Sequence, residues 1–190
     1  MILEATQLLW TAWHVLGGRG MDRARGKGIK VYKATHVNHP MAIWVRRDKK
    51  NYVWLVKFAL VLAKEYDMRF RCKCGGGGGG RRTYGCKVCP KKVHACVAGL
   101  KWMRGAVLRG FGGPNAGEYK AGQYLATEGL PKDVTPIPLC MPEKYFCKNV
   151  VTAYRKYACG PEKERFMVWD NAECVPSWWR RRERERTDTQ

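Results

Sequence analysis

Residues 52–63 read YVWLVKFALVLA, and this stretch decides the fold. Lys57 is its one charged residue, while Tyr52, Leu55 and Ala59 recur at spacings of three and four, the period of a helix face. Further apolar residues occupy the other faces. Because a helix that is apolar on most sides is buried, we predict a central helix here with the rest of the chain packed around it.

Shorter amphipathic patterns on both sides of this stretch predict further helices. Residues 1–16 carry an apolar stripe that ends at two glycines. Asn38-His39-Pro40 is typical of a helix start, since Asn caps and Pro fits the first turn, and Asp48 offers a second cap. We expect the remaining helices over residues 91–104, 118–129 and 150–158, the last of them capped by Asn149.

Glycines and prolines set the organisation between the helices. Residues 17–33 alternate glycine with Lys and Arg, as in a flexible basic loop or a solvated linker, and residues 72–90 hold six consecutive glycines and look like an insertion. Prolines predict an extended course over residues 131–142, and residues 166–179 are expected to be extended and aromatic. Strand signals are few. The predicted fold is therefore mainly α, one compact domain over residues 1–179 with a charged, disordered tail at 180–190.

Composition points to a folded protein with a polyanionic partner. The chain has 190 residues, 36 Lys or Arg against 16 Asp or Glu, a formal charge of +20 and a pI near 9.8. An apolar fraction of 45% excludes wholesale disorder. Such an excess of positive charge repels itself in a compact chain and is typical of proteins that bind nucleic acid.

Three features bear on the compartment. Residues 5–18, the longest stretch without a formal charge, fall short of the roughly 20 apolar residues of a spanning helix, so no transmembrane segment is expected. No basic region precedes the first apolar run, which argues against a secretory signal. Nine cysteines, four of them close together, do not suggest a disulfide framework. We therefore predict a cytoplasmic protein, located in the host cytoplasm if the chain is viral.

Cys72-Lys-Cys74 and Cys86-Lys-Val-Cys89 form the clearest metal-binding pattern. Four thiolates on a short loop are the ligands of a closed, structural zinc site; the alternative is four reduced thiols without metal. His94 and Cys96 are reserve ligands. Zinc would order a loop whose basic side chains contact phosphates without reading the base sequence. The predicted contacts of this loop are Arg81, Arg82, Lys91 and Lys92.

A second candidate site is the segment YKATHVNHP at residues 32–40. His36 and His39 stand before a predicted helix start, where backbone N–H groups attract anions; the alternative is that they only cap the helix or pack in the core. Trp178 and Trp179, next to a run of arginines, are candidates for stacking on unpaired bases. The predicted nucleic-acid contacts of the segment and the helix after it are Lys33, His36, Asn38, Arg46 and Arg47.

Glu4 is the carboxylate that we single out for chemistry, with His39 as a second catalytic candidate. Glu4 lies on the first predicted helix, close to the amine of the chain. An amine and a carboxylate are the groups needed to excise a base through an imine, since the amine attacks a sugar carbon and the carboxylate handles protons. The simpler explanation is that an acidic residue in a first turn is favoured by the helix dipole.

Asn38-His39-Pro40, the helix after it and the stretch EYDMRF at residues 65–70 resemble the pyrimidine dimer DNA glycosylases of the phage endonuclease V type. MPEKY at residues 141–145 and YRKY at 154–157 are similar to the C-terminal part of that family, and T-H-x-N-H-P with M-P-E-x-Y also occurs in a related group of phage proteins. The resemblance covers residues 1–16, 32–70 and 130–179. It implies a small helical enzyme in which an amine near the start of the chain acts with a glutamate, for which Glu4 would stand in.

Two functions from different classes follow. The first is DNA repair of viral type: the protein binds duplex DNA and excises a damaged base, a pyrimidine dimer, by glycosylase and abasic-site lyase chemistry. The second is a non-enzymatic basic zinc-knuckle protein that holds DNA or RNA by its backbone. Family members expose a small second residue, where this chain has Ile2, and they lack the Cys-rich loop, both of which favour the second function. A structural or host-interaction role, with the charge serving solubility, is a third possibility.

Overall fold

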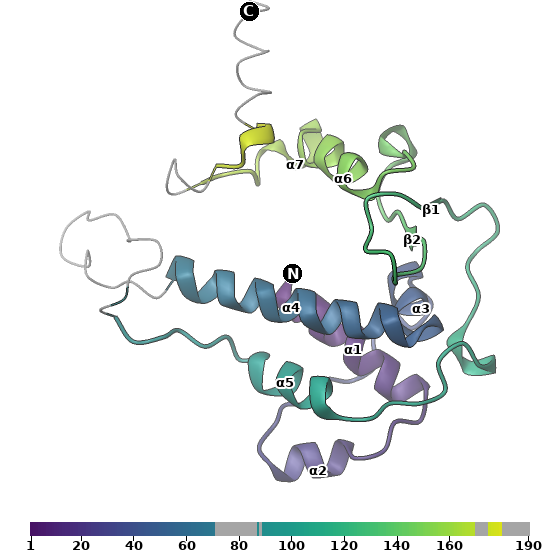
Figure 1. The fold of residues 1–190 in the computed structure, drawn as a ribbon, viewed down its shortest axis with the longest axis vertical. Coiled ribbons are helices and arrows are strands. Elements are labelled where there is room, and N and C mark those ends of the chain that lie inside the picture. Colours follow the sequence, from purple (N-terminus) through teal and green to yellow (C-terminus); the bar gives the residue numbers. More distant parts are fainter. Residues whose placement is uncertain (71–86, 88, 170–174, 180–190) are drawn as a thin grey trace, which may run out of the picture.

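A computed structural model describes residues 1–70, 87, 89–169 and 175–179 (Figure 1). The predicted insertion, apart from Lys87 and residues 89–90, lies outside the described residues, as does the predicted tail at 180–190. The fold is mainly helical, as predicted. No helix in the described ranges is both long and apolar enough to cross a membrane.

Four helices form the packed half of the molecule. They are α1 (Ile2–Val15), α3 (Pro40–Arg47), α4 (Lys49–Phe70) and α5 (Val97–Gly105). Contacts link α4 with each of the other three and α1 with α3. The predicted central helix is therefore confirmed, and it runs further in both directions than the apolar stretch that identified it.

Helix α4 is buried on one broad face rather than on most sides. Tyr52, Leu55 and Ala59 are buried, as the pattern predicts. Val53 and Val61 are 37% and 64% exposed, because they lie on the side of α4 that no other helix covers completely. At its start, the Asp48 carboxylate accepts the backbone N–H of Lys50 at 2.7 Å, which confirms the second predicted cap.

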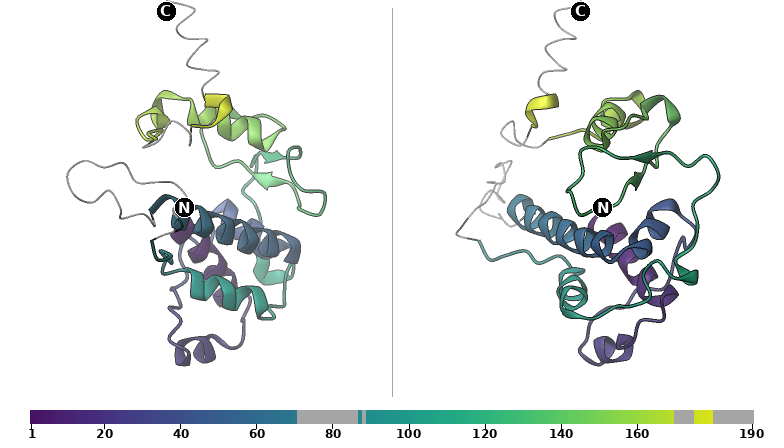
Figure 2. Two further views of the ribbon diagram at one scale, coloured as in Figure 1. Left: turned by 60° about the vertical axis from the view of Figure 1, so that its left-hand side comes forward. Right: turned by 45° about the vertical axis from the view of Figure 1, so that its right-hand side comes forward.

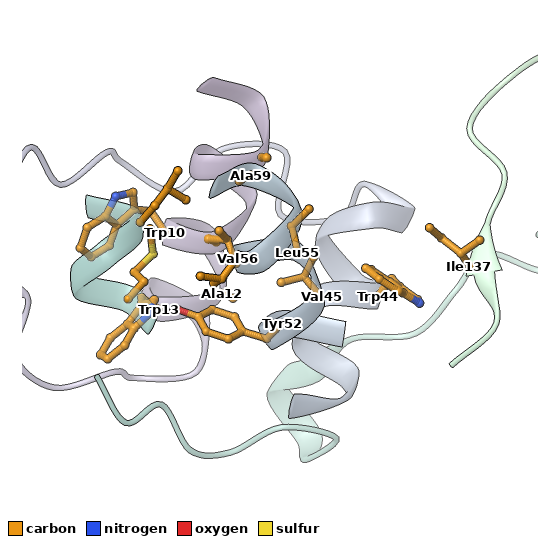
Figure 3. Close-up of a cluster of buried hydrophobic side chains, with 14 of the residues drawn as sticks. Trp10, Ala12, Trp13, Trp44, Val45, Tyr52, Leu55, Val56, Ala59 and Ile137 are labelled. Carbon is orange, nitrogen blue, oxygen red and sulfur yellow. Dashed lines mark hydrogen bonds between the residues drawn. The ribbon is translucent and has the colours of Figure 1, made fainter. Parts of the chain in front are cut away.

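Aromatic rings fill the space between α1, α4 and α5 (Figure 3). Trp10, Trp13 and Trp102 contact one another, with ring centroids 4.8 to 6.4 Å apart. The indole N–H of Trp13 donates to the Tyr52 hydroxyl at 2.6 Å, so this buried donor is satisfied. Burial raises the pKa of Tyr52, which keeps the phenol neutral.

The C-terminal region, residues 106–169 and 175–179, is made of short elements. They are the 3-10 helices η1 (Pro114–Ala116) and η2 (Glu143–Tyr145), the strands β1 (Leu125–Ala126) and β2 (Ile137–Pro138), and the helices α6 (Val150–Ala158) and α7 (Pro161–Glu164). β1 and β2 pair antiparallel, with Leu125 opposite Pro138. Asn149 caps α6 by accepting the Thr152 N–H at 3.0 Å, as predicted.

Asn51 joins the two halves of the molecule. Its side chain is fully buried and donates to the Trp44 carbonyl at 2.9 Å and to the Thr135 hydroxyl at 2.7 Å. It also accepts the Thr135 N–H at 3.0 Å. Figure 3 shows Ile137 of β2 beside Trp44, and the two views of Figure 2 place β1, β2 and α6 on the side of α4 opposite α5.

Three sequence predictions are wrong in detail. Residues 118–129 form no helix: Gly122 and Gly129 have φ of +77° and +76°, which a right-handed helix excludes, and Tyr124 and Leu125 pair with the β2 segment instead. Helix α5 begins at Val97 rather than Lys91, because the Cys96 N–H, which a helix from Lys91 would direct to a backbone carbonyl, donates to His94 Nδ1. The basic loop at 17–33 contains a short helix, α2 (Met21–Gly26).

Candidate nucleic-acid interface

Among the described residues, six exposed cations line two hollows at opposite ends of the contact between α4 and α5, and together we call these hollows the α4–α5 seam. One end, of about 250 Å³, holds Lys49 and Arg104 beside the exposed Val107. The other end, of about 190 Å³, lies between the last turns of α4 and the start of α5. The cations of the seam are Lys49, Lys64, Lys91, Lys92, Lys101 and Arg104.

The electrostatics of the seam are one-sided. Asp67 is the one carboxylate among the residues that line its two ends, and that carboxylate accepts the Lys92 N–H at 2.6 Å. Lys92 itself lies over the rings of Tyr66 and Phe70, at 5.7 and 5.9 Å. From Lys49 to Lys64 the helix rises about 22 Å, long enough to follow several phosphates of a duplex backbone. The seam can therefore hold a polyanion.

Sequence reasoning found Lys91 and Lys92 but missed the other four cations of the seam. Lys49 lies in the mixed charge run at residues 46–50, and Lys64 precedes Glu65, so neither marks a basic cluster in the sequence. The available signal was their place on the outer face of two predicted helices, at Lys49 and Lys64 of one and Lys101 and Arg104 of the other. That these two faces adjoin depends on the packing of α4 on α5, which the sequence does not show.

The histidine segment forms a tight turn held by α1. The Thr11 hydroxyl donates to the Thr35 carbonyl and accepts the Thr35 N–H, both at 3.1 Å. His36 has φ of +47°, the one positive value for a residue other than glycine in the described part of the chain, and its carbonyl accepts the His39 N–H at 2.9 Å. The turn therefore places His36 and His39 on one side of the start of α3.

His39, and not Asn38, caps α3. Its Nδ1 accepts the Met41 N–H at 3.2 Å, so the capping alternative for this histidine is confirmed. Burial, and then the charge of nearby His36, lower the pKa of His39. His36, Asn38 and His39 line a hollow of about 540 Å³ with Lys120 and Gln123, which the sequence did not place there. Lys33 is exposed beside this turn.

Arg46 and Arg47 take opposite positions at the end of α3. Arg47 is exposed, donates to the Gly117 carbonyl at 3.3 Å and lies 5.1 Å over the ring of Tyr119. Arg46 is only 2% exposed, which does not fit the predicted contact with a nucleic-acid backbone. The loop at Gly117 approaches its guanidinium, since a Cβ atom on Gly117 would lie 2.9 Å from Arg46 Nη2.

Glu4 and the Met1 amine lie together at the start of α1. The amine nitrogen is 2.9 Å from Glu4 Oε2, and both groups are exposed. Met1 also lines an apolar cavity of about 500 Å³ between α4 and the C-terminal region. The rings of Trp54, Phe58, Tyr154 and Trp178 line this cavity. His39, the other catalytic candidate, faces the separate hollow beside Lys120.

The two C-terminal tryptophans have different surroundings. Trp179 is 4% exposed and contacts Trp169, with ring centroids 4.9 Å apart, so it is not available for stacking on a base as predicted. Trp178 is half-buried, lines the apolar cavity and lies under the Arg155 guanidinium at 5.7 Å.

The predicted zinc ligands fall almost entirely outside the described residues. Cys72, Cys74 and Cys86 are not described, nor are Arg81 and Arg82, whereas Cys89 is described and half-buried. Within the described ranges, no group of three or more His, Cys, Asp or Glu side chains could hold a metal ion. The reserve ligands are engaged otherwise: His94 Nδ1 accepts the Cys96 N–H at 3.2 Å, and Cys96 Sγ lies 3.6 Å from the Tyr32 hydroxyl.

Comparison with known proteins adds no relative to this description. No family model matches the chain, and neither a curated protein nor a solved structure is significantly similar to it. The likeness to the pyrimidine dimer glycosylases therefore stays a prediction.

Proposed function

We propose that the protein binds nucleic acid, duplex DNA in particular, through its sugar–phosphate backbone. The observation that carries the proposal is the α4–α5 seam, where six exposed cations face a single carboxylate. Phosphate contacts position a protein on a duplex without reading its sequence. We therefore expect tight binding that depends strongly on salt and weakly on base sequence.

The salt dependence of binding tests this proposal. The logarithm of the affinity should fall with the logarithm of salt concentration by about 0.9 for each phosphate that the protein neutralises. Replacing Lys101 and Arg104 together by Gln should lower that slope by roughly 1.8 if each contacts one phosphate. The matched control replaces Lys148 and Lys156, two exposed cations of the C-terminal region, by Gln. A slope that changes equally in both variants would show that net charge, and not the seam, determines binding.

A catalytic extension of this function is favoured by the Met1 amine and Glu4. The amine lies 2.9 Å from the carboxylate, and Met1 lines an apolar, aromatic cavity that could accept a base displaced from the duplex. In base excision the amine nitrogen would bond to the sugar C1′ as the bond to the base breaks. The base would leave with the electron pair and take up a proton, while Glu4 accepts the proton of the amine.

Borohydride trapping distinguishes the enzyme from the binding protein. We would use duplex DNA that carries an abasic site or a thymine dimer. A covalent band would show an imine, and mapping the linked peptide would identify the amine; Glu4→Gln should then reduce trapping and leave binding unchanged. If the DNA is retarded on the gel but stays intact and shows no covalent band, the protein is a non-enzymatic binding protein. Equal affinity for RNA would mean that it binds both nucleic acids.

A structural zinc ion is a separate proposal that rests on the spacing of the cysteines. Cys72, Cys74, Cys86 and Cys89 would hold it in a closed site, where the metal orders the chain and offers no open position for catalysis. Elemental analysis of the purified protein tests it directly. We expect one zinc per chain, lost in Cys86→Ser and retained in Cys159→Ser, which changes a cysteine outside the pattern.

A further inference from the structure

Arg46 carries a buried charge that no other described residue neutralises. Its side chain is 2% exposed, and neither Nε nor Nη1 has a hydrogen-bond partner. None of the ion pairs formed within the described ranges includes it. Burial alone lowers the pKa of Arg46, with no carboxylate acting in the opposite direction. Within the described residues, two of the three guanidinium nitrogens are thus buried with neither a hydrogen-bond partner nor a counter-charge.

Such an arrangement costs folding free energy unless a partner supplies the missing acceptors. An arginine is almost never fully buried without one, and an apolar side chain of similar volume would stabilise the same position better. The guanidinium has five N–H donors in a planar fork, a geometry that matches the oxygens of a phosphate or a carboxylate. The unmet donors of Arg46 therefore point to an anion.

The loop over Arg46 consists mainly of small residues. Gly117 has φ of +81°, which favours glycine, and a Cβ atom there would lie 2.9 Å from Arg46 Nη2, so the backbone approaches the guanidinium closely. The Gly112 N–H donates to the Arg46 carbonyl at 3.2 Å. On the exposed side, Arg47 Nη1 donates to the Gly117 carbonyl at 3.3 Å. Gly117 thus separates the guanidinium groups of Arg46 and Arg47.

We propose that Arg46 and Arg47 form a binding site for a phosphate group, which enters when Gly117 moves aside. The phosphate would accept the unpaired donors of Arg46 and replace the Gly117 carbonyl as the acceptor of Arg47. Two guanidinium groups on one phosphate give charge-assisted, bidentate hydrogen bonds. The opening of the loop reduces the apparent affinity by the fraction of molecules that are open.

This site goes beyond the proposed function, which rests on the α4–α5 seam. The shared ligand chemistry is a phosphate group, and it could belong either to a small phosphate monoester or to a phosphodiester of nucleic acid. Phe111, in the same loop, lines the seam end that holds Lys49 and Arg104. The loop that covers Arg46 thus also borders the seam.

Thermal unfolding in phosphate and in chloride, at equal ionic strength and pH, tests the site. Inorganic phosphate at roughly fifty times its Kd should raise the Tm by about 5 °C over chloride. Thymidine monophosphate and the dinucleotide TpT, which carries only an internal phosphodiester, distinguish the two sources. A rise with the monophosphate alone assigns the site to monoesters, and a rise with both admits the nucleic-acid backbone. No phosphate-specific rise in the wild-type protein would overturn the proposal.

Variants separate the site from general charge effects. Arg46→Met should leave the Tm in chloride unchanged or higher, because it removes an unpaired buried charge, and should abolish the phosphate-induced rise. Arg46→Lys keeps the charge without the fork and should need at least tenfold more phosphate for the same rise. Arg25→Met removes an exposed arginine that pairs with Asp22 and should keep the whole rise.

Two further outcomes would contradict the phosphate site without bearing on the proposed function. If Arg46→Lys responds to phosphate as the wild type does, the binding of phosphate does not depend on the planar guanidinium of Arg46. This result would count against the site even if Arg46→Met does not fold. A lower Tm of Arg46→Met in chloride with an intact phosphate rise would make Arg46 a packing residue only. In either case the salt slope of DNA binding in the seam variants is measured independently, so failure of one proposal does not imply failure of the other.

Discussion

The helical half, which comprises the described residues up to Gly105, and the C-terminal region are stabilised in different ways. In the helical half, long helices bury apolar faces against one another, and the rings of Trp10, Trp13 and Trp102 fill the space between them. In the C-terminal region the elements have two to nine residues, and polar side chains such as Asn149 and Gln123 hold the backbone. Packing is non-directional and spread over many atoms, whereas hydrogen bonds are few and directional. The two halves should therefore respond differently to single substitutions.

Gly18→Ala should produce the largest effect, because it disturbs packing in the helical half. A Cβ atom at Gly18 would lie 2.2 Å from Trp13 Cε3 and 2.9 Å from Leu108 Cδ1. The Trp13 ring is itself enclosed by two other indoles, so it cannot move aside freely. We expect a loss of about 3 kcal/mol in the free energy of unfolding, the upper end for overpacking, measured by urea denaturation.

Gly105→Ala is the matched control for this substitution. Gly105 ends α5, and a Cβ atom there has open space around it. Since alanine is the better helix former, stability should stay the same or rise by up to about 1 kcal/mol. Equal destabilisation by both substitutions would show that the indole cluster is not tightly packed.

Asn51→Ala should come second, because it breaks the connection between the two halves. It removes three hydrogen bonds and leaves the Trp44 carbonyl and the Thr135 N–H without this partner. We expect a loss of about 2 kcal/mol and faster hydrogen exchange over residues 124–139 than over α1 and α4. Thr135→Val, which removes only the hydroxyl, should cost less than half as much. Uniformly faster exchange would mean that the two halves unfold as one unit.

Tyr52→Phe tests whether polar contacts also contribute inside the helical half. The phenol oxygen is the acceptor for the buried indole N–H of Trp13 at 2.6 Å. Without it the N–H has no partner, and we expect a loss of about 1.5 kcal/mol, measured by urea denaturation. Val56→Ala, in the same buried face, provides the packing reference at about 2 kcal/mol. If Tyr52→Phe leaves the free energy of unfolding unchanged, this hydrogen bond does not stabilise the helical half, and packing accounts for its stability.

His39 should give the smallest effect, and one that depends on pH. Its pKa is lowered in the folded chain, so between that value and the unfolded value near 6.5 the unfolded state binds more protons. Its contribution is therefore complete above about pH 6.5 and is lost as pH falls through the folded pKa. Protonation of His39 at Nδ1 also removes the acceptor for the Met41 N–H, and with it the cap of α3.

Two substitutions separate the cap of His39 from its titration. His39→Asn keeps a capping acceptor and should remove the pH dependence of the Tm between pH 7 and 5. His39→Ala should remove both the capping acceptor and the pH dependence, and should lower the free energy of unfolding by about 1 kcal/mol at pH 7.5. If the Tm of His39→Asn falls with pH as steeply as that of the wild type, another group is responsible.

The same contrast explains which parts of the structure the sequence predicts. Helix periodicity identified α1 and α4, since their buried faces repeat every three to four residues, whereas α6 was marked by its Asn149 cap. It failed over residues 118–129, where Tyr119 and Tyr124 have a suitable spacing but glycines with positive φ interrupt the helix. It also missed α2, because six residues with one buried alanine carry almost no periodic signal.

The candidate sites were predictable only where they are local in sequence. The histidine turn and the pairing of Glu4 with the Met1 amine follow from residues a few positions apart. The α4–α5 seam needs two helices to adjoin, and the burial of Arg46 needs a loop that lies about 70 residues away, as its contact with Gly117 shows. Neither the neighbours of these side chains nor their exposure can be read from periodicity.

The Asn51–Thr135 pair has a consequence for the order of folding. The two residues are 84 positions apart, so when the helical half leaves the ribosome the segment that satisfies Asn51 has not yet emerged. The helices can form their mostly nearer contacts first, with the Asn51 amide still hydrated. Docking of residues 124–139 then closes a long loop and removes that water, which makes it the late and slow event of folding. Until it occurs, the apolar residues around Trp44 stay exposed on the newly made chain.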